Sequence, residues 1–408
     1  MRAPGESVTR ILFVDHGALT RAGLPQSLRR LRPDWQAVFA DSGPAALELL
    51  AREGFDALVS DLELPGMDGA QLLTQVRDRY PNIVRLCLSA SMDDEAFLRA
   101  VPVTHQFLRK PCQADTLCDL VERACTLREI LHNEAIQGLV SQIKHLPTTS
   151  RTFDALARAM AKPNAHTHDI TQIVSGDTPL CIKLLQLVNS GFFRRSAPIT
   201  SVREAVAFAG MEMIKSLALS ACVFSSLDAS PIASRLLHDL QSRSIRKANF
   251  ARALMNEGRL ADEAFTAALL LDIGQAVLAL SAPEKFDHMV AVARSTGRPA
   301  HELESEYFGV SHPEVGAYLL GLWGLPLDLI EAVAYHHQPS LVAHPQTDVL
   351  AAVHVADAVI EATPERSSKL IDQLDAVFVQ RSEVSRWLKA WNIDTEADAL
   401  VAQRMTAA

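Results

Sequence analysis

Short apolar runs alternate with amphipathic stretches along the first 130 residues. The runs RILFVD, WQAVFA, DALVSD, IVRLCLS and HQFLRK, at 10–15, 35–40, 56–61, 83–89 and 105–110, are rich in Val, Ile, Leu and Phe. Stretches with helical spacing separate them, for example GAQLLTQVRDRY at 69–80. Five strands that alternate with helices predict an α/β domain with a doubly wound, five-stranded parallel sheet.

The rest of the chain has a different pattern. Apolar positions recur with helical spacing through DITQIVSGDTPLCIKLLQLVN, EAFTAALLLDIGQAVLAL and LAAVHVADAVIEA, and no period of two persists. This predicts an all-α domain over 148–408, although the pattern assigns no role to 341–408. Apolar residues three or four apart from Leu120 to Leu146 predict one long amphipathic helix that ends at Pro147. We therefore divide the chain into 1–128, a linking helix at 129–147, and 148–408.

Composition narrows the classes of function. The chain has 408 residues, of which 48% are hydrophobic and 21% charged, and its formal net charge is −9. The acidity is spread along the chain without a basic stripe, which argues against nucleic acid as a partner. The N-terminus enters a strand pattern without a signal-peptide core, and no run of about 18 uncharged apolar residues predicts a membrane span. We expect a cytoplasmic protein with reduced cysteines.

Polar residues stand at the ends of four predicted strands: Asp15, Asp61, Ser89 and Lys110. Because the carboxyl ends of parallel strands meet at one edge of a sheet, these side chains are expected to converge. Two carboxylates suit Mg²⁺, a lysine can neutralise phosphoryl oxygens, and a hydroxyl can bind a new phosphate. The pattern predicts a phosphoryl site with Asp61 as nucleophile, Asp15 on the metal side, and Ser89 and Lys110 as the phosphate-sensing pair.

These residues, with DLELPGMDG and FLRKP around them, closely resemble the receiver domain of two-component response regulators over about residues 8–130. The resemblance implies a flavodoxin-like fold and phosphorylation of Asp61 by a cognate histidine kinase. It also implies a Mg²⁺ site formed by Asp15, Asp61 and the backbone carbonyl of Glu63. Phe107 would be the aromatic residue that turns inward on activation, and the bond before Pro111 would be cis.

One position departs from the receiver pattern. Receivers usually end their first strand with two acidic residues, whereas this chain has Asp15 followed by His16. Histidine is a poor ligand for Mg²⁺ and repels the cation when protonated. The substitution predicts a weakened Mg²⁺ site. It leaves open a pseudo-receiver in a scaffold that works without phosphorylation.

The segments LPTTSRTFDALARAM, DTPLCIKLLQLVNSGFF and PITSVREAVAFAGMEMIKSLALS follow one another in the second half. In this order they resemble the HDOD domain, a relative of the HD phosphohydrolases, over about 140–340. The resemblance implies an HD-superfamily-like helical fold. It also implies an output domain that binds signalling proteins, with cyclic-dinucleotide pathways as one source of partners.

The metal-binding HD families provide a comparison for the residues of the second half. Their ligands include a helix histidine, an adjacent His-Asp pair, later histidines and a final aspartate. Here Arg243 stands at the helix histidine and Leu271 precedes Asp272, so two of the four ligands of a mononuclear centre are missing. The resulting degenerate site consists of Arg243, Leu271, Asp272, His312, His336, His337 and Asp357.

We expect Arg243 to pair with Asp272 or Asp357, because a buried carboxylate needs a compensating charge. We expect no metal in this domain and no enzymatic activity. The alternative is a metal-dependent phosphohydrolase that uses Asp272, His312, His336, His337 and Asp357. The sequence thus favours a response regulator in which phosphate on Asp61 changes how the receiver contacts a non-catalytic HDOD domain. A homodimer is left open.

Overall fold

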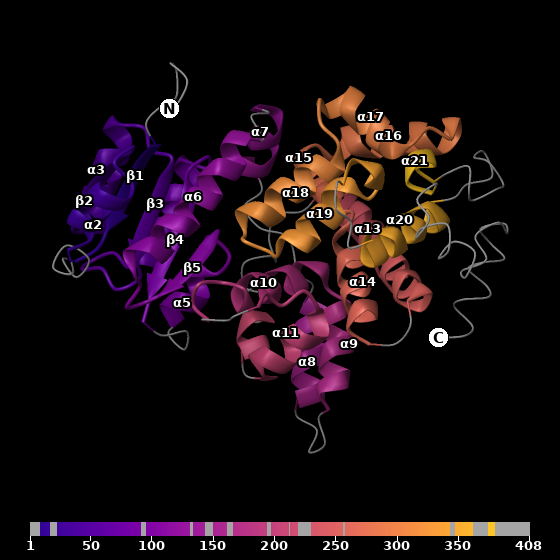
Figure 1. Cartoon of the computed structure of the whole chain (residues 1–408), viewed down its shortest axis with the longest axis horizontal. Helices are drawn as coiled ribbons and strands as arrows, with labels where there is room; N and C mark the ends of the chain where they lie inside the picture. The colour runs from indigo at the N-terminus through magenta and orange to yellow at the C-terminus, as the bar shows by residue number, and fades with distance from the viewer. Residues whose placement is uncertain are drawn as a thin grey trace.

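The computed structural model describes residues 9–16, 23–90, 95–130, 134–142, 150–160, 166–193, 197–211, 213–218, 230–255, 258–342, 347–361 and 374–379. An α/β domain and a larger helical domain lie side by side (Figure 1). The helices α10 (Thr178–Val188) and α18 (His312–Leu322) of the helical domain face the α/β domain.

The α/β domain contains the five expected strands: β1 (Thr9–Val14), β2 (Trp35–Ala40), β3 (Ala57–Asp61), β4 (Val84–Ser89) and β5 (Gln106–Arg109). All neighbouring pairs are parallel, and the order is β2-β1-β3-β4-β5. Every residue of β3 and β4 is buried, as expected for central strands covered on both faces. The predicted doubly wound sheet is confirmed.

Among the described residues of this domain, five helices surround the sheet. The helix α2 (Leu24–Leu31) packs against α6 (Ala114–Ile130), whereas α4 (Gly69–Arg79) packs against α3 (Gly43–Arg52) and α5 (Glu95–Ala100). The start of α4 is fixed by a capping box, in which Asp68 accepts from the backbone N–H of Gln71 and the Gln71 side chain accepts from that of Asp68. This cap sets the end of the loop that follows Asp61.

Within the described residues, the predicted linking helix corresponds to α6 and α7 (Glu134–Gln142). Residues 131–133 and Pro147 lie outside the described residues, so the continuity and the predicted end of the helix stay predictions. Helix α6 packs against α2 and β4 of the α/β domain and against α18, and α7 packs against α15 and α18. The linking segment therefore contacts both domains.

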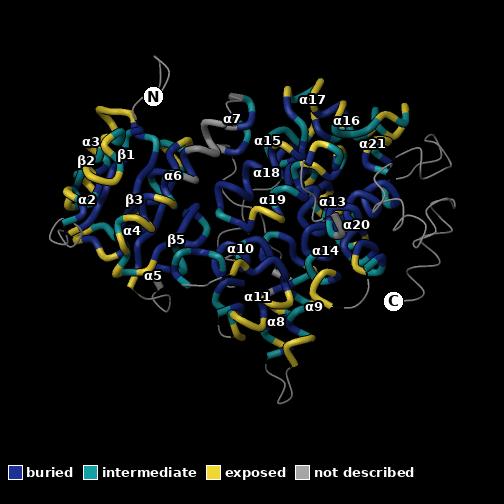
Figure 2. The backbone as a smooth tube through the Cα atoms, in the orientation of Figure 1, coloured by how far each residue is buried: buried dark blue, intermediate teal, exposed yellow. Residues whose placement is uncertain are grey.

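The helical domain has two groups of helices. The first contains α8 (Ser150–Met160), α9 (Thr167–Ser175), α10 and α11 (Val202–Ala209). The second contains α13 (Pro231–Leu254), α14 (Arg259–Leu270), α15 (Ile273–Ser281), α16 (Pro283–Thr296), α17 (Ala300–Phe308), α18, α19 (Leu327–Tyr335), η1 (Pro339–Leu341), α20 (Thr347–Ile360) and α21 (Ala376–Val379). Helix α13 packs against α14 and α20, and α15 packs against α18. These contacts bring residues far apart in the chain into one core, drawn dark blue in Figure 2.

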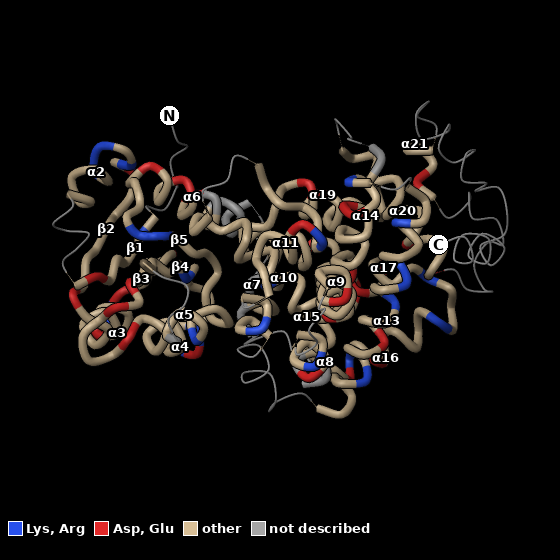
Figure 3. Tube along the Cα trace, turned by 90° about the horizontal axis from the view of Figure 1, so that it is seen from below, with Lys and Arg blue, Asp and Glu red and all other residues tan. Residues whose placement is uncertain are grey.

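Within the described residues, one segment is long and apolar enough to cross a membrane, Arg259–Ser281, with a mean hydropathy of 1.7. The structure divides it into α14 and α15 at Leu271 and Asp272, and 83% of its apolar window is buried inside the protein. It has the burial of a core helix pair. Acidic and basic residues are mixed along the trace of both domains (Figure 3).

Candidate functional site

The predicted phosphoryl site lies at the carboxyl edge of the parallel sheet. Asp61 ends β3 and Ser89 ends β4, and Asp15 and Lys110 follow β1 and β5. The Lys110 ammonium donates to Oδ1 of Asp15 at 3.2 Å and also to Oδ2 of Asp61. Strands that start far apart in the chain thus bring three of the four predicted side chains into direct contact.

Two carboxylates contact Lys110 at this edge of the sheet. Burial raises the pKa of Asp61, and the hydrogen bond and charge of Lys110 offset only part of that rise. Asp15 is buried as well, with 3% of its side chain exposed. The oxygens of these two buried carboxylates are the ligands that Mg²⁺ prefers. The donor set therefore fits a magnesium ion held by Asp15 and Asp61.

The other predicted residues lie around this pair. The backbone N–H of Glu63 donates to Oδ1 of Asp61 at 3.1 Å, which holds the loop after β3 against the carboxylate. Ser89 is buried at the end of the adjacent strand, and the Lys110–Pro111 bond is cis, as the resemblance implied. His16 is exposed after Asp15, so an imidazole stands where a second carboxylate would add an oxygen ligand.

A second cluster of charges lies in the helical domain, and Lys247 is at its centre. This residue is in α13, with 1% of its side chain exposed. Its Nζ lies 2.7 Å from Oδ2 of Asp272, 2.8 Å from Oδ1 of Asp357 and 2.9 Å from Oε1 of Glu361. Although burial lowers the pKa of Lys247, the three carboxylates outweigh burial and raise it above its usual value. A permanent ammonium thus compensates the aspartate of the apolar segment.

The predicted partner of Asp272 was therefore wrong. Arg243 binds Glu361 through Nη1 at 2.9 Å and Gln275 through Nη2 at 3.1 Å, and does not pair with Asp272 or Asp357. Arg243 and Lys247 are four residues apart, so both lie on one face of α13. Lys247 is nearer the buried end of that face, where the carboxylates converge. That spacing could have suggested Lys247, which the sequence interpretation missed.

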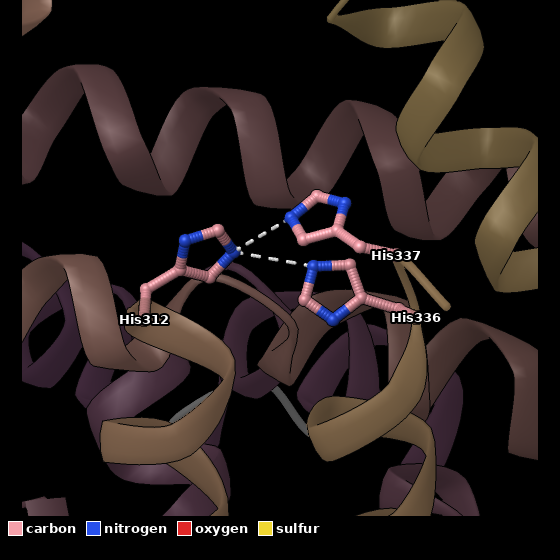
Figure 4. A group of neighbouring side chains, drawn as sticks. All are labelled: His312, His336 and His337. Atoms are coloured by element: carbon pink, nitrogen blue, oxygen red, sulfur yellow. Dashed lines mark hydrogen bonds between the residues drawn. The ribbon is translucent and has the colours of Figure 1, made fainter. Parts of the chain in front are cut away.

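Three histidines of the degenerate site also come together. His312 begins α18, and His336 and His337 follow α19. Nε2 of His312 lies 3.2 Å from Nε2 of His336 and 3.3 Å from Nε2 of His337 (Figure 4). Leu271 is fully buried beside Asp272 and offers no ligand atom. The structure thus divides the predicted site into a charge cluster around Lys247 and a histidine cluster.

Comparison with known proteins agrees with this geometry. The model of the response regulator receiver domain matches residues 11–122, and that of the HDOD domain matches 146–339. The chain belongs to the response regulators with a receiver and an HDOD domain.

Two curated relatives match part of this response regulator. An uncharacterized protein of Treponema pallidum is 26% identical over 201 residues, which are 49% of this chain and 39% of the relative. The response regulator protein FleR of Pseudomonas aeruginosa is 40% identical over 173 residues, which are 41% of this chain and 33% of the relative. The chain thus spans between a third and two fifths of the length of these relatives.

A crystal structure of a virulence factor from Campylobacter jejuni shares the fold. It covers 66% of this chain and 94% of its own, with a TM-score of 0.52 and 18% identity.

The receiver and the HDOD domain meet along β5, the last strand of the sheet. Gly191, just after α10, forms a parallel bridge with Leu108 of β5. The Gln186 side chain donates to the carbonyls of Thr104 at 3.1 Å and His105 at 2.7 Å. From the other side, Gln106 donates to the carbonyl of Leu322 at 3.0 Å. The exposed edge of a sheet is a template for pairing, and here the HDOD domain covers it.

Phe107, the predicted switch aromatic, is 1% exposed within this interface. The centroid of its ring lies 5.2 Å from that of Phe97 of α5. The centroid of the Phe97 ring lies 5.8 Å from that of Phe192 in the HDOD domain. Arg109 of β5 lies over the Phe192 ring at 5.5 Å. The aromatic packing is therefore continuous from the receiver core into the HDOD domain.

Proposed function

We propose that a histidine kinase phosphorylates Asp61 and that the phosphate changes how the receiver docks on the HDOD domain. The observation that carries this proposal is the position of Phe107. It lies on β5 between the strand end that carries Lys110 and the interface with Phe192. A change in the Lys110 contacts acts on the same strand that pairs with Gly191.

The proposed mechanism is a population shift. In the unphosphorylated protein, Lys110 bridges Asp15 and Asp61. A phosphoryl group on Asp61 adds negative charge, draws Lys110 and the Ser89 hydroxyl toward its oxygens, and repositions the end of β5. A switch needs a differential contact in its two states, and the Phe97–Phe192 packing and the bridge at Gly191 provide one.

We further propose that the HDOD domain acts by binding a protein rather than by catalysis. The Lys247 ammonium supports this, because it lies among the carboxylates that would otherwise bind a cation of a hydrolytic centre. The docked face is the surface that phosphorylation would uncover. We also propose that the protein is cytoplasmic, with a receiver domain at 1–128, a linking helix at 129–147 and an HDOD domain at 148–408. The first candidate partners are enzymes of cyclic-dinucleotide signalling and a second copy of the chain.

Phosphorylation of the full chain tests the first step. The chain is incubated with Mg²⁺ and acetyl phosphate, and its mass is measured by intact-protein mass spectrometry. We expect one added phosphoryl group, lost in Asp61→Asn and retained in Asp78→Asn, a matched substitution on the exposed end of α4. We also expect faster hydrogen exchange at β5 and around Gly191 after phosphorylation. Phosphorylation without any change in exchange there would contradict the mechanism.

Exposed His16 favours a second candidate, a scaffold whose receiver is not phosphorylated. The substitution His16→Asp restores the second carboxylate and distinguishes the two. If the wild type takes up phosphate and His16→Asp does so faster at low Mg²⁺, the receiver works with a weakened metal site. If only His16→Asp takes up phosphate, the native chain is the scaffold.

A further inference from the structure

We propose that the HDOD domain binds one divalent transition-metal ion, best matched by Zn²⁺, through Nε2 of His312, His336 and His337. The fourth coordination position faces Oδ1 of Asp272. The site is separate from the phosphoryl site and does not depend on the proposed phosphorylation of Asp61.

The first argument is the orientation of the three rings. Each ring has its Nδ1 against an oxygen acceptor. The acceptors are Oε2 of Glu304 for His312 at 2.6 Å, the carbonyl of Val333 for His336 at 2.8 Å, and Oδ2 of Asp357 for His337 at 3.2 Å. A neutral imidazole that donates from Nδ1 presents a lone pair at Nε2. With all three rings neutral, three lone pairs would face one another, and a cation would stabilise this arrangement.

The second argument is distance. Nitrogens bound at 2.0–2.1 Å to a tetrahedral zinc ion lie about 3.3 Å apart. Nε2 of His312 is 3.2 and 3.3 Å from the Nε2 atoms of His336 and His337. The ligand atoms of all three residues lie within 4.8 Å of one another, so binding draws the two adjacent rings toward a shared ion. Figure 4 shows both rings directed at His312.

The third argument is an unpaired oxygen. Asp272 is 3% exposed, and its Oδ1 has no hydrogen-bond partner, whereas its Oδ2 accepts from Lys247. Oδ1 lies 3.9 Å from Nε2 of His312, about half an ångström more than two ligands of one zinc ion. The backbones of α15 and α18 approach closely here, because a Cβ at Gly274 would overlap the carbonyl of His312. Asp272 would thus be shared between an ammonium and the metal.

The fourth argument is charge. The two clusters contain the carboxylates of Asp272, Asp357, Glu361 and Glu304 and the cations of Lys247 and Arg243. With neutral histidines, this gives a net charge of minus two in a largely buried region. A divalent ion balances it. A buried charge is retained in a fold when it is paired.

The ligand chemistry selects the metal class. Imidazole suits zinc and its transition-metal neighbours, whereas Mg²⁺ and Ca²⁺ prefer oxygen. His312 and His336 are 1% and 0% exposed, which is typical of a closed structural site. Glu304 is a positioning residue, because it orients His312 through the other ring nitrogen. The ion would join α15, α18 and the end of α19.

Metal titration of the full chain tests the proposal. The protein is stripped with a chelator, and Zn²⁺ is added from a metal buffer and counted by mass spectrometry. Co²⁺ is then used to read geometry from visible absorption. We expect one ion per chain, the intense absorption of four-coordinate cobalt, and a higher melting temperature with zinc.

Variants locate the site. We expect His312→Gln and His336→Gln to lose the ion, and Glu304→Gln to bind about 10–100-fold more weakly. His288→Gln, a matched change of an exposed histidine, should bind as the wild type does. The helical circular dichroism of each stripped variant shows whether it is folded. A wild type that binds no zinc under these conditions would overturn the proposal. So would a six-coordinate cobalt spectrum, or retention of the ion by both folded histidine variants.

Discussion

Replacing Lys247 by methionine should destabilise the HDOD domain strongly. The methionine keeps most of the length of the side chain but removes the ammonium that lies within 2.9 Å of three carboxylates. Because the Lys247 side chain is 1% exposed, water cannot replace its ammonium beside the carboxylates. Removing one partner of a buried ion pair costs about 3–5 kcal/mol of unfolding free energy. That is a large part of the roughly 5–15 kcal/mol that stabilises a domain.

Urea unfolding followed by far-ultraviolet circular dichroism measures this loss, since the helical domain dominates that spectrum. The measurement is made with a chelator present, which keeps the result independent of the proposed metal. Adding Asp272→Asn to Lys247→Met should recover part of the loss, because it removes one of the unpaired charges. Arg203→Met, which breaks a half-exposed pair with Asp262, serves as the control and should cost less than about 1 kcal/mol. A loss below about 1 kcal/mol for Lys247→Met would refute the reasoning.

Three further predictions concern the HDOD domain and its interface. Lys183 of α10 donates to the carbonyl of Val101 in the receiver at 3.3 Å, and burial lowers its pKa to about 7. Between this value and the usual 10.5, the separated domains are expected to bind one more proton than the docked ones. The docking free energy should therefore become more favourable as pH rises over that window, by at most about 1.4 kcal/mol per pH unit. Protection of the β5 amides from hydrogen exchange measures docking, and this pH-dependent gain in protection should be absent in Lys183→Met. Gly191→Val places a Cβ 3.1 Å from Cδ1 of Leu120, so it should loosen the interface and speed hydrogen exchange at β5. Phosphorylation of Asp61 should stay intact. Unchanged exchange at β5 would argue against the interface. Asp177→Ala removes the buried cap of α10, where Asp177 accepts from the Leu180 N–H at 3.0 Å. It should cost about 1–2 kcal/mol of unfolding free energy in the same urea assay, and an unchanged stability would argue against this cap.

The strand pattern predicted every strand end of the receiver sheet to within one residue. It also located Asp15, Asp61, Ser89 and Lys110, because residues that end neighbouring parallel strands must share one edge of the sheet. The helical half was less accessible. Its periodicity gave the helices, but helical periodicity does not say which helices pack together, and Arg243 was paired with the wrong partners for that reason.

The sequence by itself determined the order of the elements and which polar residues end the strands of the receiver sheet, since each depends on local spacing. It also placed Leu271, which offers no ligand atom, before Asp272. Only the tertiary structure decided that Lys247 compensates Asp272, that three histidines converge, and that Gly191 pairs with β5. The most distant of these residues in the chain are Leu108 and Gly191, which pair across the interface. Their geometry is set by packing between whole helices, and a buried charge takes whichever partner that packing brings within reach.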